Sequence, residues 1–264
     1  MKLYPRDYNT LLPDEQLRFD KIKRRERISG SAFRKSLFRQ YPKAARHSLH
    51  LFPNNYLDVV ELKDVDRLRS KAAKFKRLVG STRCLERDVL GFIKKNKAYF
   101  IIGSILKRYQ FGHHEAYLFP EFPLGNSYVV DYLLVGRSSG GYEFLFLELE
   151  DPFKKSVLAK GDLANSYRKG LNQISDWKSW LDSYFTSLRE VFKSAKKPGM
   201  ALPDEFIDYD TSRIHYAVVS GSREGYSEKT YRLRRDKHKH DGVLILHYDN
   251  LADSAYAIIG AETY

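Results

Sequence analysis

Three acidic residues lie within two apolar stretches that are joined by a Gly/Ser-rich turn. Asp131 interrupts the run that begins at Tyr128, and Glu148 and Glu150 end the run that follows the turn. An ionised carboxylate is costly inside a core strand unless it is paired with a cation or bound to a metal. Acidic side chains that converge from neighbouring strands therefore predict a site for a divalent cation.

The expected hairpin brings these acids close together. Because side chains alternate along a strand, Glu148 and Glu150 share the face of Phe146. A turn centred on residues 138–139 pairs Asp131 with Phe146 and places Asp131 diagonal to Glu148, with Cβ atoms about 7–8 Å apart. One cation between two carboxylates could bridge that separation.

The alternative is an ordinary hairpin whose strand ends emerge into water. That alternative fits Glu150, which is followed at once by an Asp-Pro pair. It fits Asp131 poorly, because the neighbouring positions are valines and leucines.

Residues 163–192 predict one long amphipathic helix directly after the hairpin. Apolar side chains recur there at helical spacing: Leu171, Ile174, Leu181, Phe185, Leu188 and Phe192. Gln173, Trp177 and Trp180 fall on an adjacent face. This amide is either a boundary residue beside core aromatics or a group that holds a phosphate, a water or a metal ligand above the sheet. Periodicity alone favours the first interpretation, and the position of the helix directly after the acidic hairpin strengthens the second.

The order of these segments resembles the PD-(D/E)XK nuclease superfamily, and in detail its Shedu branch of bacterial anti-phage defence nucleases. The resemblance rests on Asp131, on E-L-E-D-P at 148–152, on Lys-Gly at 160–161 and on Q-I-S-D-W at 173–177. Two later segments add to it, at 215–223 (ending in Gly-Ser-Arg) and at 243–251. It covers the chain from about residue 84 onward. It implies an α/β fold, a PD-(D/E)XK nuclease-like core with a mixed central sheet flanked by helices.

The same resemblance implies a metal-dependent DNA endonuclease that hydrolyses or nicks phosphodiesters in anti-phage defence. Asp131, Glu148 and Glu150 would bind Mg²⁺ or Mn²⁺, with the carbonyl of Leu149 as a further ligand. Gln173 would position water or phosphate. The remaining alternative is a catalytically silent nucleic-acid-binding or assembly module with the nuclease fold.

One position departs from the family pattern. Glu150 stands where the superfamily usually has a lysine that activates water and stabilises negative charge. A carboxylate cannot supply positive charge, but it can act as a further metal ligand or a general base. Lys160 is the favoured replacement for the missing lysine. Lys154, Lys155 and Lys169 are less favoured substitutes.

The charge of the chain predicts a polyanionic partner. The 264 residues carry a formal net charge of +13, and residues 1–50 contain 13 Lys/Arg against 5 Asp/Glu, a net +8 (13 − 5). Such a balance favours a polyanionic partner, and the family resemblance implies that this partner is nucleic acid, double-stranded DNA. The expected contacts are Lys21, Lys23, Arg24, Arg25 and Arg27 in a first basic segment, and Arg232, Arg234 and Arg235 in a second. A solvated helix face or an oligomer-contact arm explains the first segment about equally well, and binding to a phage protein or a membrane surface is a further alternative.

The cysteine count and the apolar runs limit the protein class. The single cysteine, Cys84, cannot form an intramolecular disulfide, so we expect a cytoplasmic protein. No apolar stretch reaches the length of a membrane span. We further expect a homo-oligomer.

The chain divides at residues 80–82 into two expected regions. Residues 1–80 form a basic, mainly helical region, and residues 81–264 form the nuclease domain. Ser81 or Thr82 is expected to cap a helix over 85–97, with Glu86 either supporting that cap or lying near the site. Further strands are expected at 214–220 and 243–247, with a polar helix between them at 224–235.

Overall fold

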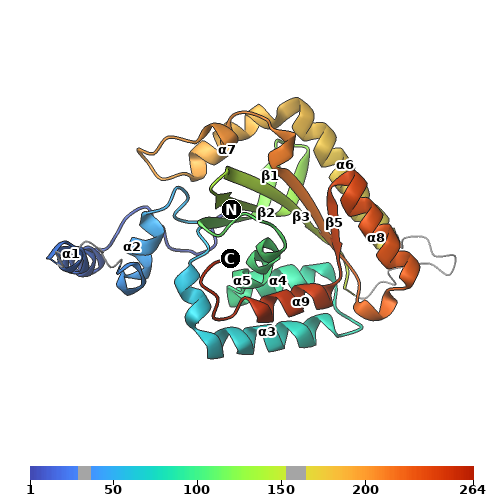
Figure 1. Cartoon of the computed structure of the whole chain (residues 1–264), viewed down its shortest axis with the longest axis horizontal. Helices are drawn as coiled ribbons and strands as arrows, with labels where there is room; N and C mark the ends of the chain where they lie inside the picture. Colours follow the sequence, from blue (N-terminus) through green and yellow to red (C-terminus); the bar gives the residue numbers. More distant parts are fainter. Residues whose placement is uncertain (29–36, 153–164) are drawn as a thin grey trace.

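A computed structural model describes residues 1–28, 37–152 and 165–264, and a five-stranded sheet lies at its centre (Figure 1). The strands are β1 (Glu115–Leu124), β2 (Tyr128–Ser138), β3 (Gly141–Leu149), β4 (Ile214–Val219) and β5 (Val243–Leu246), in spatial order β1-β2-β3-β4-β5. The first three pair antiparallel, and β3, β4 and β5 pair parallel. The sheet is therefore mixed, as predicted.

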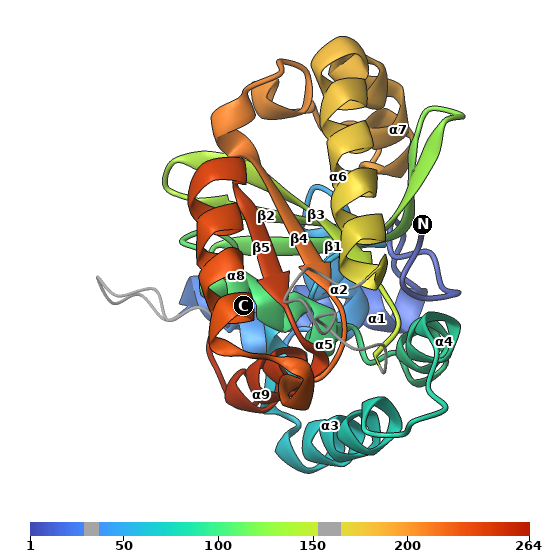
Figure 2. The same cartoon turned by 90° about the vertical axis from the view of Figure 1, so that its right-hand side faces the viewer.

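Helices cover both faces of the sheet (Figures 1 and 2). One face packs against α3 (Val65–Val79), α4 (Glu86–Asn96), α5 (Tyr99–Gly103) and α9 (Tyr248–Ala257), and the other packs against α6 (Asn165–Tyr184) and α7 (Leu188–Ala195). Helix α8 (Glu228–Asp241) contacts β5, while α1 (Pro13–Ile28) and α2 (Lys43–Ser48) lie to one side. This arrangement confirms an α/β fold with a mixed sheet flanked by helices.

Strand β3 shows why the sheet needs two helical layers. Phe144 and Phe146 belong to the core on the α6 side, and Leu145 and Leu147 belong to the core on the α9 side. Because successive side chains point to opposite faces, an apolar run buries both faces of a strand. Glu148 continues the Phe144 and Phe146 series, as predicted.

The predicted hairpin register is wrong by two residues. Ser138 pairs with Gly141 and Leu133 pairs with Phe146, so the turn consists of residues 139–140 rather than 138–139. Gly141 has φ +103°, a conformation open to glycine but strained for other residues. The paired register ends at Tyr132 opposite Leu147, next to Asp131 and Glu148, so the expected pair of Asp131 with Phe146 does not form.

The predicted helix over 163–192 is interrupted. Helix α6 ends at Tyr184, which has φ −133° and ψ 11°, and a short 3₁₀ turn at Phe185–Ser187 precedes α7. Phe185 and Leu188, on either side of this break, are both buried in the same core. The change of direction lets apolar side chains on both helices keep facing the sheet.

The region before residue 81 shares a core with the rest of the chain. Leu68 and Phe75 of α3 belong to the same buried cluster as Leu251 of α9. Ser81 and Thr82 do not cap the next helix: α4 begins at Glu86, and Asp88 accepts a hydrogen bond from the amide of Leu85 (2.9 Å). The division into regions at residues 80 and 81 stays a prediction.

The second basic helix lies later than predicted. Helix α8 begins at Glu228 and ends at Asp241, whereas the expected range was 224–235. Ser227 caps it by accepting a hydrogen bond from the amide of Thr230 (3.3 Å). The strands that flank this helix, β4 and β5, end within one residue of their predicted bounds.

Candidate active site

Asp131 lies at an irregular point of the sheet. Val130 and Leu133 are three residues apart yet belong to the same core face, so the alternation of faces shifts by one residue between them. On the neighbouring strand β1, Glu121 has a positive φ of 51°. The carboxylate Oδ2 of Asp131 accepts a hydrogen bond from the amide of Leu149 (2.8 Å). Asp131 is thus fixed against the end of β3 by the backbone.

Glu148 and Glu150 are both buried at that same end, with 3% and 2% exposure. The amide of Glu150 donates to the carbonyl of Val219 (2.8 Å), and the carbonyl of Glu150 accepts from the hydroxyl of Tyr248 (2.8 Å). The backbone of Glu150 is therefore held between β4 and α9. The alternative in which Glu150 emerges into water is wrong.

The electrostatics of these acids reflect burial and mutual repulsion. Burial raises the pKa of Asp131 to about 7; the hydrogen bond from the Leu149 amide opposes this effect, and the charges of Glu86 and Glu150 add to it. Burial likewise raises the pKa of Glu148 to about 9, and the neighbouring Asp131 and Glu150 charges raise it further. The end of β3 thus groups more carboxylates than its surroundings stabilise in the ionised form.

Lys169 of α6 provides a positive charge at this cluster. Its ammonium Nζ lies 3.0 Å from Glu150 Oε1 and 3.8 Å from Glu86 Oε2. Desolvation lowers the pKa of Lys169, but its carboxylate partners raise it by more, so the net shift is upward. Of the lysines considered from the sequence, Lys169 belongs to the described residues, and the structure brings it to the acids.

Gly170 allows α6 to approach the acids. A Cβ atom at this position would lie 2.9 Å from a methyl of Val218 and 3.5 Å from Cγ of Glu150. Only a residue without a side chain permits that separation without a shift of the helix or the strand. The close contact brings Lys169, the preceding residue, within reach of Glu150.

Gln173 lies one turn after Lys169, on the same side of α6. Its side-chain Oε1 is buried and has no hydrogen-bond partner in the structure. A buried amide oxygen without a partner is costly, and in native proteins it commonly marks a place for a water, an ion or a ligand. This favours the interpretation in which Gln173 acts at the site.

Glu86 adds a fourth acid. Its amide donates to Asp151 Oδ1 (2.9 Å), and its carboxylate lies near Lys169. Asp88 and Asp151 thus satisfy amides at the start of α4, which leaves the carboxylate of Glu86 directed toward the site. Glu86 also lies in the first turn of α4, where its charge is favourably placed toward the helix dipole as predicted, so the structure is compatible with both roles.

Sequence reasoning missed two residues that build this cluster. Asp151 connects the end of β3 to α4, and Tyr248 of α9 anchors the carbonyl of Glu150. For Lys169, which we had ranked below Lys160, a signal was present: it precedes Gln173 by four residues and so shares its helical face. No comparable periodicity marks Asp151 or Tyr248. Lys154, Lys155 and Lys160 lie outside the described residues.

The two later segments of the family resemblance meet beside the sheet. The amide of Arg223 donates to Asp249 Oδ2 (2.7 Å), and its guanidinium Nη2 lies 2.5 Å from Asp253 Oδ2. The Gly-Ser-Arg turn after β4 and the first turns of α9 are therefore connected.

The predicted nucleic-acid contacts fall into two separate groups. Helix α1 and helix α8 lie on opposite sides of the molecule (Figure 1). Lys21, Arg24, Arg25, Arg232 and Arg235 are exposed. Lys23 pairs with Glu26 (3.1 Å), and Arg234 donates to Asn250 Oδ1 (3.3 Å). For Arg27 of α1 the structure describes the backbone alone. The basic residues therefore do not form one continuous stripe.

The acids fit a divalent cation by donor type and by charge. Carboxylate and amide oxygens are donors that suit Mg²⁺, and Asp131 and Glu148 offer two carboxylates in one cluster, while Gln173 offers an unpartnered buried amide oxygen on α6. Over the ranges that the structure describes, no group of three or more His, Cys, Asp or Glu side chains is arranged as a complete ligand set. A cation held by two carboxylates, with amide or carbonyl oxygens as its remaining protein ligands, agrees with the donor types and with the absence of such a group among the described residues.

No helix among the described residues is both long enough and apolar enough to cross a bilayer.

Comparison with known proteins places the chain in a family. No curated protein matches it. The C-terminal family of the Shedu protein SduA matches residues 84–252, which is more than half of the chain and includes β1–β5, α4, α6 and α8. The match confirms the resemblance that the sequence motifs indicated. The chain belongs to the family of the Shedu protein SduA C-terminal region.

Proposed function

We propose that this protein is a Mg²⁺- or Mn²⁺-dependent DNA endonuclease that acts in anti-phage defence. The observation that carries the proposal is the convergence of Asp131, Glu148 and the Glu150–Lys169 ion pair at the end of β3. Membership in the Shedu family supports the defence role. Strongly raised carboxylate pKa values beside a lysine are a common property of functional sites, which supports the proposal.

Asp131 and Glu148 would hold the cation, with the Leu149 carbonyl as a further ligand. The cation would supply Lewis acidity and make the attacking water more acidic. Gln173 would hold that water or a phosphate oxygen through its unpartnered Oε1.

Lys169 would take the place of the lysine that the superfamily usually has at position 150. Glu150 would hold its ammonium beside the acids, either in addition to or instead of serving as a metal ligand or base. During hydrolysis the water oxygen bonds to phosphorus as the ester P–O bond breaks, and the leaving oxygen takes up a proton. A fixed ammonium stabilises the negative charge that accumulates on the phosphate. Lys160 stays a second candidate for that role.

A cleavage assay on supercoiled and linear DNA tests this proposal. We expect cleavage with Mg²⁺ or Mn²⁺ and none with EDTA. Asp131→Asn and Glu148→Gln should abolish cleavage while DNA affinity, measured by fluorescence anisotropy, is retained. Glu143→Gln is the matched control, because Glu143 is also on β3 but pairs with His215 (2.7 Å). Wild-type cleavage rates in Asp131→Asn would contradict the site assignment.

The second candidate function is a catalytically silent nucleic-acid-binding or assembly module. The glutamate at position 150 favours it, since this position carries no positive charge of its own. DNA binding without cleavage under any divalent cation would select this alternative.

A further inference from the structure

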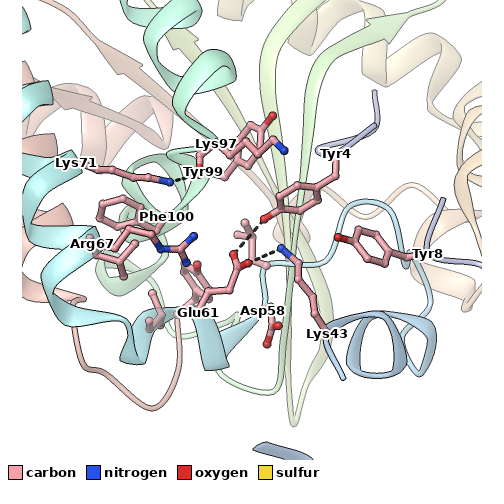
Figure 3. A pocket seen from close by; sticks show the side chains of 14 residues that line it. Tyr4, Tyr8, Lys43, Asp58, Glu61, Arg67, Lys71, Lys97, Tyr99 and Phe100 are labelled. Atoms are coloured by element: carbon pink, nitrogen blue, oxygen red, sulfur yellow. Dashed lines mark hydrogen bonds and ion pairs between the residues drawn. The ribbon is translucent and has the colours of Figure 1, made fainter. Parts of the chain in front are cut away.

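A second cluster of charges surrounds a cavity of about 220 Å³ on the α3 and α5 side of the molecule (Figure 3). Its charged lining residues are Lys43, Asp58, Glu61, Arg67, Lys71 and Lys97. Its aromatic lining residues are Tyr4, Tyr8, Tyr99, Phe100 and Tyr264. We call it the lysine cavity. It shares Tyr99 with a cavity that includes Asp131, but the two have no charged residue in common.

The acids of the lysine cavity already have partners. Glu61 accepts a hydrogen bond from the Tyr4 hydroxyl (3.0 Å) and forms an ion pair with Lys43. Asp58 is bound by the guanidinium of Arg46, with its Oδ2 2.7 Å from Nη2 and 2.9 Å from Nε. Neither carboxylate needs a further cation.

Two lysines of the cavity differ from Lys43 in their contacts with the described residues. Lys71 donates a hydrogen bond to the backbone carbonyl of Lys97 (3.4 Å), and the Lys97 ammonium lies 5.7 Å from the centre of the Tyr4 ring. Within residues 1–28, 37–152 and 165–264, neither lysine forms an ion pair with a carboxylate. Desolvation lowers the pKa of Lys71, and the charges of Arg67 and Lys43 lower it further. Positive charge is therefore in excess.

The geometry of the cavity directs this charge at one space. In Figure 3 the ends of Lys71 and Arg67 lie on one side of a central space, with Glu61 extending below Arg67, and the Tyr4 hydroxyl and the Lys43 ammonium lie on the other side. Arg67 Nε contacts Asp64 (2.6 Å), which leaves the other guanidinium nitrogens for a ligand. Guanidinium and ammonium groups together are typical of sites for phosphate. Pockets for drug-sized ligands measure about 300–1,000 Å³, so this cavity suits a smaller molecule.

We propose that the lysine cavity binds a small phosphate-bearing molecule, with Lys71, Arg67 and Lys97 contacting the phosphate and the tyrosine rings contacting the remainder. The ligand class is a phosphate monoester, such as a mononucleotide, or phosphate itself. This site is separate from the proposed nuclease chemistry, since it uses none of the acids at the end of β3.

Isothermal titration calorimetry with inorganic phosphate, AMP and adenosine tests the proposal on the full chain, at about 150 mM salt so that weak surface charge effects are screened. We expect AMP or phosphate to bind and adenosine not to bind. Lys71→Met should weaken binding about tenfold or more, because it removes a charged hydrogen-bond donor while keeping the aliphatic stem. Lys74→Met, an exposed lysine on the same helix, should leave the affinity unchanged.

The comparison of ligands identifies what is recognised. AMP that binds at least tenfold tighter than phosphate assigns the tyrosines a role in holding the base, and equal affinities assign recognition to the phosphate group alone. No binding of either ligand by wild type, or an equal loss of affinity in Lys71→Met and Lys74→Met, would overturn the proposal. The unliganded melting temperature of each variant shows whether it folds, and Lys97→Met provides a second variant should Lys71→Met be unstable.

Discussion

The acidic end of β3 and the lysine cavity both hold charge that the protein does not neutralise, but of opposite sign and built in different ways. The acids come from two paired strands and are fixed by backbone hydrogen bonds, as in the contact between the Leu149 amide and Asp131. The lysines come from separate elements, with Lys43 on α2, Lys71 on α3 and Lys97 directly after α4. The first arrangement suits a cation that requires fixed ligands, and the second suits a polyatomic anion.

The comparison also shows how each region limits its own excess charge. At the acidic end, the ammonium of Lys169 lies 3.0 Å from Glu150 Oε1 and offsets part of the carboxylate charge. In the cavity, Glu61 neutralises Lys43 and is itself held by Tyr4. A charge change at the acidic end of β3 should therefore alter DNA cleavage, and a charge change in the lysine cavity should alter the affinity for its ligand.

The largest effect is expected from reversing the charge at Glu150. Glu150→Lys should abolish cleavage, because a second ammonium would repel both the cation and Lys169 at the end of β3. Gel-based cleavage of supercoiled DNA measures this effect. Glu150→Gln removes the charge without adding a new one and should reduce cleavage less severely. Full cleavage by Glu150→Gln would place Glu150 outside the chemistry.

A smaller decrease is expected when Lys169 is neutralised. Lys169→Met should lower kcat by about 10²–10³, the usual cost of removing one group that stabilises transition-state charge. Lys169→Arg should recover part of the rate, since it restores the positive charge. Lys178→Met is the matched control on α6, because Lys178 contacts the Asp241 carbonyl at the other end of the helix (2.5 Å). An unchanged kcat in Lys169→Met would move the search to Lys160.

The acids and the buried His47 should give the metal-free protein opposite pH responses. The pKa of Asp131 is raised to about 7 and that of Glu148 to about 9, so the folded state binds more protons than the unfolded state between about pH 4 and pH 9. Stability should therefore fall as pH rises through that window. Burial lowers the pKa of His47 to about 4, so its contribution should be lost as pH falls from about 6.5 to 4.

Melting temperatures measured in EDTA across this pH range test the responses of the two acids and of His47. Mn²⁺ should raise the melting temperature more at pH 8.5 than at pH 5.5, because only ionised acids bind the cation. Glu148→Gln should make stability fall less steeply with rising pH across the whole window from about pH 4 to pH 9, because Glu148 holds its extra proton in the folded state throughout that window. A slope equal to that of wild type in Glu148→Gln would contradict the assigned cause.

The smallest effects are expected from the exposed basic residues. Truncation of the first 50 residues would remove buried core side chains such as Leu3 and Tyr8, so substitutions are the better test. Replacing Lys21, Arg24 and Arg25 by glutamine should reduce the salt slope of DNA binding by about 0.9 for each phosphate that the protein no longer neutralises. An unchanged slope would assign α1 to packing or oligomer contacts. Arg232→Gln with Arg235→Gln on α8 is the parallel variant on the opposite side.

The acidic cluster at the end of β3 could be predicted from the sequence, because a charged residue that interrupts the apolar pattern of a strand is easy to recognise. A carboxylate inside an apolar run, as at Asp131, conflicts with the local pattern, and alternation correctly placed Glu148 on the face of Phe146. The exact pairing failed because turn length, not periodicity, sets the register, and a shift of the turn by one residue changes every partner by two. The break of the long helix at Tyr184 was likewise invisible, since the apolar spacing continues through it.

The lysine cavity could not be predicted in this way. Lys71 is one of several lysines on a basic helix, and nothing in its neighbours distinguishes it from the exposed Lys74. The cavity exists only because residues as distant as Tyr4 and Tyr264 meet around α3. Long-range packing of this kind leaves no periodic trace in a single sequence.

The central claim is that Asp131 and Glu148 together hold a divalent cation. Anomalous difference density from a crystal soaked in Mn²⁺ tests it most directly. The account predicts a peak between the two carboxylates, about 2.0–2.2 Å from an oxygen of each, as expected for a small hard cation, and no such peak in Asp131→Asn. A soaked crystal without density at this position, with Lys169 as the only cation among the acids, would contradict the claim.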